Sequence, residues 1–143
     1  MITRRQAITV ALALLPSQLA AAPEAALAEA IRALVGDATP IDSGIELRLP
    51  ATAENGAQVP LAILVDSPMT DRDHVTAIHV FAPRNPTPDV ASFHLFPGLA
   101  RAEVHTRIRV AEAQEILVLA RHANGTIHRA QAALKVTRGG CLA

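Results

Sequence analysis

The residues with the clearest chemical potential stand at the C-terminus, where the chain ends Gly139-Gly140-Cys141-Leu142-Ala143. Cys141 is the only cysteine, so no disulfide can form within the chain. A thiol reacts as its thiolate, and an exposed tail lets the thiolate form without the cost of burial. Gly139 and Gly140 have no Cβ atom and bend easily. They predict a thin hinge directly before the thiol.

A flexible arm, residues 138–143, would let this thiol enter other proteins, react there and withdraw. When extended, residues 138–142 would reach roughly 15 Å beyond the last strand. Such an arm is typical of a carrier that holds its cargo covalently on Cys141. Two other interpretations remain open, a tail without a role and a cysteine that locks an intermolecular dimer. A prenyl anchor fits less well, because prenylation requires a cysteine four residues from the end and Cys141 is third from the end.

The rest of the sequence does not show the pattern of a catalytic or metal site. The chain has no Gly-rich phosphate or dinucleotide motif and no Gly-x-Ser-x-Gly elbow. The run 71–73, Asp-Arg-Asp, is more typical of a charged loop than of paired catalytic carboxylates. The histidines show no spacing typical of metal ligation; they are His74, His79, His94, His105, His122 and His128. We therefore expect no catalytic residue, no metal ion and no cofactor.

The spacing of hydrophobic residues predicts one short helix followed by strands. Residues 23–35 have helical spacing, with Leu27, Ile31 and Leu34 at i, i+4 and i+7, and Gly36 follows as a stop. After this segment the pattern changes to that of strands bounded by Pro, Gly and Asn. Strands are expected at residues 45–49, 59–65, 75–82, 90–96, 101–110, 116–120 and 126–136.

These strands predict a sandwich. In residues 101–110 apolar and polar side chains alternate strictly, which is typical of a half-buried antiparallel strand. Residues 116–120 are uniformly apolar and are therefore expected at the centre of a sheet. Asn124-Gly125 predicts the turn of a hairpin. About seven strands at roughly ten-residue spacing predict an all-β, immunoglobulin-like antiparallel sandwich over residues 23–137, which begins with the short helix.

The N-terminus has the pattern of an export signal, residues 1–22. Arg4 and Arg5 form the charged start, and an apolar stretch, residues 7–15, precedes a run of small residues. The apolar stretch is too short for a membrane-spanning helix, which needs about 20 residues. The paired arginines resemble a twin-arginine signal, and general secretion stays open because Ala7 stands where a bulky residue is usual. We expect a periplasmic location.

The composition excludes some classes of function. The chain has 143 residues, which suits one domain. It has no Trp and no Tyr, so aliphatic side chains must fill the core. Acidic and basic residues balance at 13 each, and removal of the leader, with its two arginines, leaves a mildly acidic chain. This balance lacks the basic excess of nucleic-acid binding, and we expect neither nucleic acid nor membrane as a partner.

Several short phrases follow one another in the order seen in a known family. They are Glu54-Asn55-Gly56-Ala57 with Val59-Pro60, Phe81-Ala82-Pro83-Arg84-Asn85-Pro86 with Pro88, Val90-Ala91-Ser92-Phe93-His94-Leu95, Arg101-Ala102-Glu103-Val104, Thr106-Arg107-Ile108-Arg109, Lys135-Val136-Thr137 and Gly139-Gly140-Cys141. On these phrases, the stretch from Ile45 to Cys141 resembles SoxY, the sulfur-binding subunit of the periplasmic thiosulfate-oxidising Sox system.

The resemblance implies a function and a set of partners. SoxY-like proteins fold as immunoglobulin-like sandwiches and form a heterodimer with a SoxZ-like subunit. A haem-containing SoxAX-like enzyme joins the C-terminal cysteine to thiosulfate as an S-thiosulfonate. A SoxB-like hydrolase releases sulfate, and a SoxCD-like enzyme acts on the sulfur that remains. By this resemblance Cys141 is the covalent attachment site, Gly139 and Gly140 are the hinge, and the protein is a carrier rather than an enzyme.

The last two residues depart from the family pattern. The family tail usually reads Gly-Gly-Cys-Gly-Gly, whereas Leu142 and Ala143 follow Cys141 here. A branched side chain beside the thiol stiffens and widens the tip of the arm. Two alternatives therefore stay open. One is a SoxY-like carrier for another periplasmic sulfur or dehydrogenase system, and the other is a non-catalytic interaction module whose cysteine forms an intermolecular disulfide.

Overall fold

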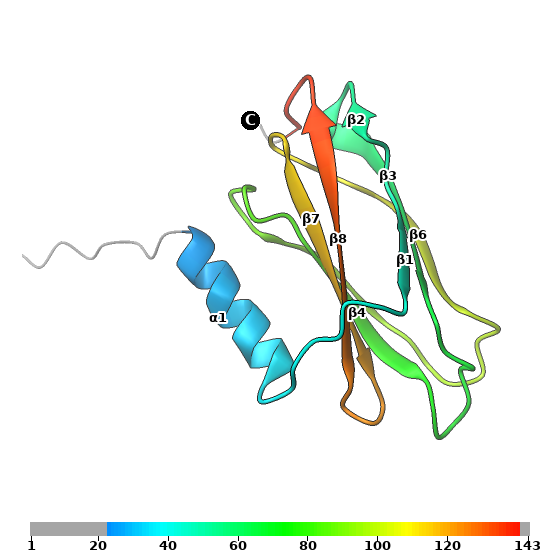
Figure 1. Cartoon of the computed structure of the whole chain (residues 1–143). Coiled ribbons are helices and arrows are strands. Elements are labelled where there is room, and N and C mark those ends of the chain that lie inside the picture. The colour runs from blue at the N-terminus through cyan, green and yellow to red at the C-terminus, as the bar shows by residue number, and fades with distance from the viewer. Residues whose placement is uncertain (1–22, 141–143) are drawn as a thin grey trace, which may run out of the picture.

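The computed structural model describes residues 23–140, which form one α-helix and two β-sheets. The sheets face each other as a sandwich, and the helix lies on one side of it (Figure 1). In chain order the elements are α1 (Pro23–Val35), β1 (Ile45–Arg48), β2 (Thr52–Ala53), the 3-10 helix η1 (Gly56–Gln58), β3 (Val59–Val65), β4 (Val75–Phe81), β5 (Asp89–His94), β6 (Ala102–Ile108), β7 (Gln114–His122) and β8 (Ile127–Val136).

The strands are divided between a three-stranded sheet, β1-β3-β6, and a five-stranded sheet, β2-β8-β7-β4-β5. The named strands pair antiparallel, apart from the parallel pairing of β2 with β8. The predicted all-β sandwich with a short N-terminal helix is confirmed. The strand that the prediction missed is β2, which has two residues and pairs with Lys135 and Val136. So short a strand cannot show hydrophobic alternation.

Aliphatic side chains fill the space between the sheets, as the absence of Trp and Tyr predicts. The strand β7 lies between β8 and β4 in the larger sheet and is buried on both faces. Ile116 and Val118 face the space between the sheets, whereas Leu117 and Leu119 face α1. The central position expected for residues 116–120 is therefore confirmed.

The helix α1 covers the outer face of the five-stranded sheet (Figure 1). Ile31 and Leu34 lie on one stripe of the helix and pack against a buried cluster that includes Phe81. The helix ends at Gly36, which has φ +58° and donates its amide hydrogen to the carbonyl oxygen of Arg32 at 2.9 Å. No helix within residues 23–140 is long and apolar enough to cross a membrane.

The segment between α1 and β1 is tied to β8. The Ile41 amide donates to the Ile127 carbonyl at 2.9 Å, and the Arg129 amide donates to the Ile41 carbonyl at 2.8 Å. The Arg129 guanidinium also binds the Asp42 carboxylate through two hydrogen bonds of 2.6 and 2.9 Å. These bonds lower the pKa of Asp42. Both side chains are exposed, so the pair orients the segment more than it stabilises the fold.

The two strongest local patterns have the predicted structure. Along β6, side chains alternate between the interior and the solvent, and the strand pairs with β3 from Val65 opposite Ala102 to Val59 opposite Ile108. The hairpin between β7 and β8 turns at Gly125, which has φ +87°. Both features follow from local chemistry, since alternation selects a half-buried strand and a positive φ selects glycine.

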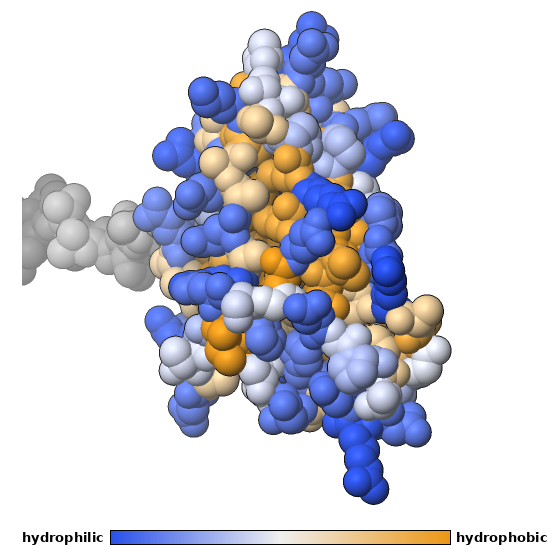
Figure 2. Space-filling view, turned by 45° about the vertical axis from the view of Figure 1, so that its right-hand side comes forward, coloured by the Kyte–Doolittle hydropathy of each residue, from blue (hydrophilic) through white to orange (hydrophobic). Residues whose placement is uncertain are grey.

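The side of the sandwich next to β1 has a mixed surface. Hydrophobic side chains gather near the middle of this face, and hydrophilic side chains surround them (Figure 2). Ile45 and Leu47 of β1 are half-buried and pack against the edge of the core. Their strand neighbours Glu46 and Arg48 are exposed.

Candidate functional site

The structure describes part of the C-terminal segment on which the sequence predictions centre. Residues 141–143, including the predicted attachment site Cys141, lie outside the described residues, as does the predicted signal peptide, residues 1–22. Residues 138–140 are described, and their two glycines are half-buried. We call residues 138–140 the root of the arm and build the candidate site from them.

Main-chain hydrogen bonds hold the root of the arm against the sandwich. The Gly140 amide donates to the carbonyl oxygen of Val110 at 3.0 Å, and the Gly56 amide donates to the carbonyl oxygen of Arg138 at 2.8 Å. The Gly56 carbonyl in turn accepts from the Val110 amide at 2.7 Å. The sequence predicts an arm that is free from Arg138 onward. In the structure, the first three residues of that arm are held at two points instead.

Two glycines permit this close approach. A Cβ atom on Gly56 would overlap the carbonyl oxygen of Val110 and lie 2.8 Å from the amide nitrogen of Gly140. A Cβ atom on Gly140 would overlap the main chain of Gly56 and Ala57. Only a hydrogen atom fits at either position. Gly140 therefore makes a close main-chain contact, a role different from the bending that its type suggests in the sequence.

The turn that presents Gly56 is set by the residue before it. Asn55 has an extended backbone, with φ −127° and ψ 108°, and its side-chain oxygen accepts a hydrogen bond from the Ala57 amide at 2.9 Å. Asn favours such turns because its short side chain can bond to the main chain two residues later. The turn leads into η1 and leaves the Gly56 main chain available to both Val110 and Arg138.

A buried polar pair, Asn85 and Gln114, holds the chain on both sides of Val110. The Asn85 amide group donates to the Arg109 carbonyl at 2.8 Å, and its oxygen accepts from the Ala111 amide at 2.8 Å. The Gln114 amide group donates to the same Asn85 oxygen at 3.1 Å. Buried polar groups that are satisfied in this way fix the chain rigidly. Val110 is thus held in place by contacts that do not involve the root of the arm.

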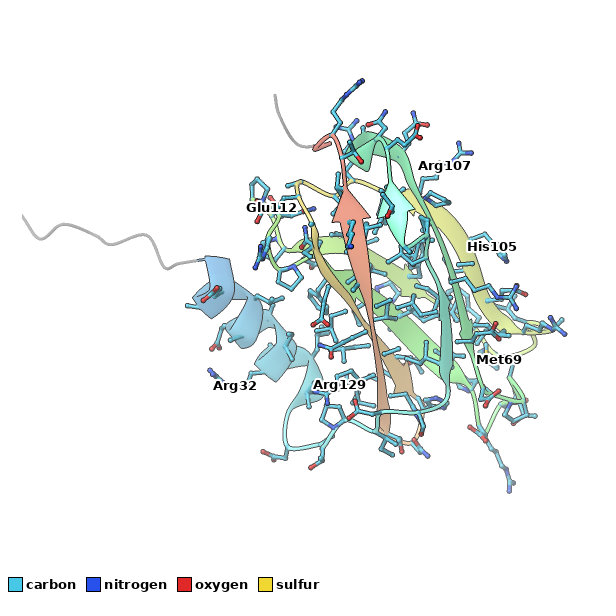
Figure 3. All side chains as sticks on the ribbon, turned by 45° about the horizontal axis from the view of Figure 1, so that its top comes forward. Arg32, Met69, His105, Arg107, Glu112 and Arg129 are labelled. Carbon is cyan, nitrogen blue, oxygen red and sulfur yellow. The ribbon has the colours of Figure 1, made fainter. Side chains whose placement is uncertain are left out.

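The charged side chains near the root do not form a catalytic cluster. Arg84 and Glu112 approach to 3.5 Å and are both exposed. Figure 3 shows Glu112 at the same end of the sandwich as the root of the arm, and Met69 toward the other end. Within the described range 23–140, no group of three or more His, Cys, Asp or Glu residues could hold a metal ion.

The histidines do not gather at one place, although His122 lies beside His128 and His79 lies beside His94. His105 is on the exposed face of β6, where its ring bonds to Glu103 at 2.7 Å. His122 is buried at the hairpin end of β7, and its Nε2 has no hydrogen-bond partner among the residues that the structure describes. Its ring lies 4.8 Å from that of His128, centroid to centroid. Burial lowers the pKa of His122, and the neighbouring His128 lowers it further.

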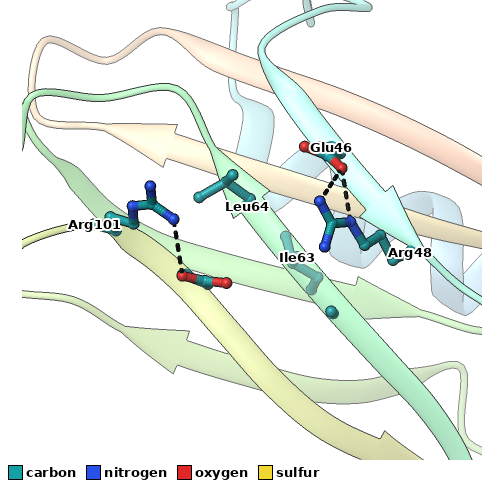
Figure 4. Close-up of a pocket in the computed structure, with 7 residues that line it drawn as sticks. Glu46, Arg48, Ile63, Leu64 and Arg101 are labelled. Atoms are coloured by element: carbon teal, nitrogen blue, oxygen red, sulfur yellow. Dashed lines mark hydrogen bonds and ion pairs between the residues drawn. The ribbon is translucent and has the colours of Figure 1, made fainter.

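A small pocket lies on the outer face of the three-stranded sheet, away from the arm. Two ion pairs border it, Glu46 with Arg48 at 2.7 Å and Arg101 with Glu103 at 3.9 Å (Figure 4). The pocket lies beside Leu64, near the end of β3 that is farther from η1. Its volume is about 70 Å³, room for a few water molecules. This pocket is therefore not part of the candidate site.

Sequence reasoning missed three residues of the site, namely Gly56, Val110 and Asn85. Gly56 and Asn85 belong to phrases that carry the resemblance, but no local pattern assigns them a role. Their partners are far away in the chain, because Gly56 meets Gly140 and Asn85 meets Ala111. The available signal was the glycine that follows the turn-forming Asn55, since glycine often marks a close approach of two main chains.

The described residues thus define a β-sandwich whose C-terminal segment is held against one end of the sandwich. Comparison with known families matches residues 31–141 to the family described as "Sulfur oxidation protein SoxY". This match covers well over half of the chain, and the chain belongs to the SoxY family. Membership supports the predicted class, a sulfur carrier rather than an enzyme.

Solved structures agree with this assignment. The sulfur carrier protein SoxY from Chlorobium limicola f thiosulfatophilum is 35% identical with a TM-score of 0.64, and the match covers 78% of this chain and 96% of that one. A superoxide reductase (neelaredoxin) from Ignicoccus hospitalis is 12% identical with a TM-score of 0.58, over 66% of this chain and 80% of that one. The second likeness shows a shared fold alone. Comparison with curated proteins found no match.

Proposed function

We propose that this protein is a periplasmic sulfur carrier that holds thiosulfate-derived intermediates covalently on Cys141. The observation that carries the proposal is the extent of the family match, which runs from residue 31 to Cys141 itself. The solved relative that is 35% identical is a sulfur carrier protein. A single cysteine that follows two glycines at the end of a rigid sandwich supplies the one nucleophile that such a carrier requires.

The proposed loading step forms one sulfur–sulfur bond. The Cys141 thiolate joins the outer sulfur of thiosulfate, and the two electrons released pass to a haem-containing SoxAX-like enzyme. Water then cleaves the bond between the sulfonate group and the sulfur beneath it, with a SoxB-like hydrolase as catalyst. Sulfate and protons leave, and a persulfide remains on Cys141. A SoxCD-like enzyme would oxidise that sulfur further.

Export places the carrier where these reactions occur. The signal predicted in residues 1–22 supports a periplasmic location, and the family belongs to the sulfur oxidation system. The hinge proposed at Gly139 and Gly140 has to work together with the contacts of Gly140 to the sandwich. Movement of the whole arm from Arg138 would require the hydrogen bonds of the root to break. Movement from Cys141 onward would leave those bonds in place.

Mass spectrometry of the intact protein tests the proposal. Protein isolated from cells grown on thiosulfate should carry added masses that correspond to a thiosulfonate or to extra sulfur atoms, and these should map to Cys141. The variant Cys141→Ser should lose every added mass and should not support thiosulfate oxidation, because a hydroxyl is not nucleophilic enough to replace the thiolate.

A control is Ser92→Ala, which removes a hydroxyl of β5 that bonds to the ring of His79 at 2.8 Å and should leave loading unchanged. Thiosulfate oxidation at the normal rate by Cys141→Ser would contradict the proposal. A stable disulfide-linked dimer, seen on a non-reducing gel in place of loaded monomer, would support the interaction module instead.

A further inference from the structure

The root of the arm is bound to the main chain of the sandwich. Three main-chain hydrogen bonds connect Gly56, Val110 and the root, with donor–acceptor distances of 2.7, 2.8 and 3.0 Å. Two of them involve the root directly, through the carbonyl of Arg138 and the amide of Gly140. No side chain takes part in these three bonds. The binding of the root therefore depends on how closely the main chains approach.

The approach is closer than a side chain allows. At Gly56 and at Gly140, an added Cβ atom would overlap main-chain atoms of the other segment. Main-chain atoms move only with their whole segment, so the overlap could not be relieved by a change of rotamer. The contact therefore requires glycine at both positions, and a substitution at either one should separate the root from the sandwich.

Buried side chains hold the receiving surface in shape. Asn85 is 5% exposed and bonds to the main chain on both sides of Val110, and Gln114 bonds to Asn85. Gly56 forms the other part of the receiving surface, and Asn55 fixes the turn that contains it. Both sides of the surface are thus organised by hydrogen bonds in which the root takes no part.

We propose that Gly56 and Val110, held by Asn55 and Asn85, form a docking seat for Gly140 that positions Cys141 by fixing the residue before it. The seat fixes the chain one residue before the thiol. With the root docked, the Cα atom of residue 141 stays about 3.8 Å from that of Gly140, whereas release of residues 138–140 would let it lie up to about 14 Å from that of Thr137. This inference rests on the proposed function only for the use of the thiol. The docking itself is independent of any cargo.

Amide hydrogen exchange, measured by NMR on the isotope-labelled protein, tests the seat. In the unmodified chain, the Gly140 amide should exchange roughly tenfold more slowly than an unstructured amide of the same sequence, as expected for one hydrogen bond of ordinary net strength. In Gly140→Ala, the amides at position 140 and at Gly56 should both lose protection, because each bond needs the root in place. Amides of β7 should keep theirs.

The matched control is Arg138→Ala. It removes an exposed side chain next to the same bonds but keeps the carbonyl that Gly56 uses, so the protection of Gly140 and Gly56 should persist. A second readout is the alkylation of Cys141 by a small maleimide and by a polymer-linked maleimide. Gly140→Ala should raise the rate with the polymer relative to the small reagent, because release of the root moves the thiol away from the sandwich.

Free exchange of the Gly140 amide in the unmodified chain would overturn the seat. Unchanged Gly56 protection in a folded Gly140→Ala variant would overturn it as well. Neither result would affect the carrier function, which is tested through the mass on Cys141. Conversely, a Cys141→Ser variant that still supports thiosulfate oxidation would remove the carrier function and leave the exchange results standing.

Discussion

At the scale of single residues, His122 is an ionisable group whose charged form the fold disfavours. Its ring is buried at the hairpin end of β7, its Nε2 lacks a hydrogen-bond partner within residues 23–140, and His128 lies against it. Asp73 opposes the shift from 3.8 Å away, but burial dominates and the pKa of His122 is lowered. The folded protein therefore prefers the neutral ring.

This preference predicts a loss of stability in acid. In the unfolded chain the histidine pKa is about 6.5, so below that pH the unfolded state binds a proton that the folded state refuses. The free energy of unfolding should therefore decrease as the pH falls below about 6.5, and it should stop decreasing below the lowered pKa of the folded state. Urea unfolding at a series of pH values measures this effect. In His122→Gln the decrease should be smaller.

A second histidine contributes to the same trend. Burial also lowers the pKa of His79, which Asp89 partly opposes, so some pH dependence will remain in His122→Gln. His94→Gln supplies a control away from His122. The contribution of His122 should persist in it, while that of His79, whose pKa His94 also lowers, should become smaller. An equal pH dependence in His122→Gln and in the unmodified protein would contradict the role assigned to the His122 ring.

At the scale of elements, the contact between α1 and the larger sheet includes one aromatic side chain. Phe81 is fully buried and lies in the cluster against which Ile31 and Leu34 of the helix pack. Phe81→Ala should lower the free energy of unfolding by about 3–5 kcal/mol, because it removes apolar surface and leaves a cavity under the helix. Denaturant unfolding followed by circular dichroism measures it.

Phe96 offers a matched control on the same protein. Its side chain is 72% exposed, so Phe96→Ala should change the stability by less than about 0.5 kcal/mol. A small effect of Phe81→Ala would show that α1 can leave the sheet at little cost, and that the helix is not part of the folded unit.

The elements that could be predicted from sequence are those with long, regular patterns. The helix at residues 23–35 and the strand at residues 59–65 have the predicted bounds, because the helix repeats one hydrophobic period and the strand is a mostly apolar run that follows a turn signal. The strand at residues 114–122 is longer than the apolar run 116–120, since its polar ends, Gln114 and His122, are also buried. Tertiary contacts, rather than local pattern, include those ends in the strand.

The candidate site was predictable to a lesser degree. The single thiol and the two glycines before it are visible in the sequence, because they depend on residue type and position alone. The docking of Gly140 was not predictable, because it joins segments about eighty residues apart through main-chain atoms, which have the same chemistry at every residue. The role of Asn85 was hidden for the same reason, since its partners are the main chain near Val110.

At the scale of the whole molecule, the sandwich separates two regions along its long axis. The root of the arm lies where β7 begins, and the paired rings of His122 and His128 lie where β7 ends. A strand of this length spans about 27 Å. The helix covers the outer face of the larger sheet (Figure 1), so a large partner can approach the seat along the smaller sheet without displacing α1.

Heterodimer formation is the prediction that belongs to this scale. Co-expression with a SoxZ-like subunit should yield one complex that elutes earlier from a sizing column than either chain alone and contains both chains in equal amounts. Analytical ultracentrifugation measures the mass of that complex. Because the arm should stay available to other enzymes, Cys141→Ser should bind the subunit as well as the unmodified chain does. Separate elution of the two co-expressed chains would contradict the prediction.

The contact between Gly140 and its docking seat, Gly56 and Val110, is made by main-chain peptide groups. Peptide groups do not gain or lose protons between mild acid and mild alkali, and oxidants that attack sulfur leave them intact. Acid that lowers stability through His122 should therefore leave the docking of Gly140 unaltered. The sulfur on the proposed attachment site could then be oxidised step by step while the hydrogen bonds that hold the preceding residue stay unchanged.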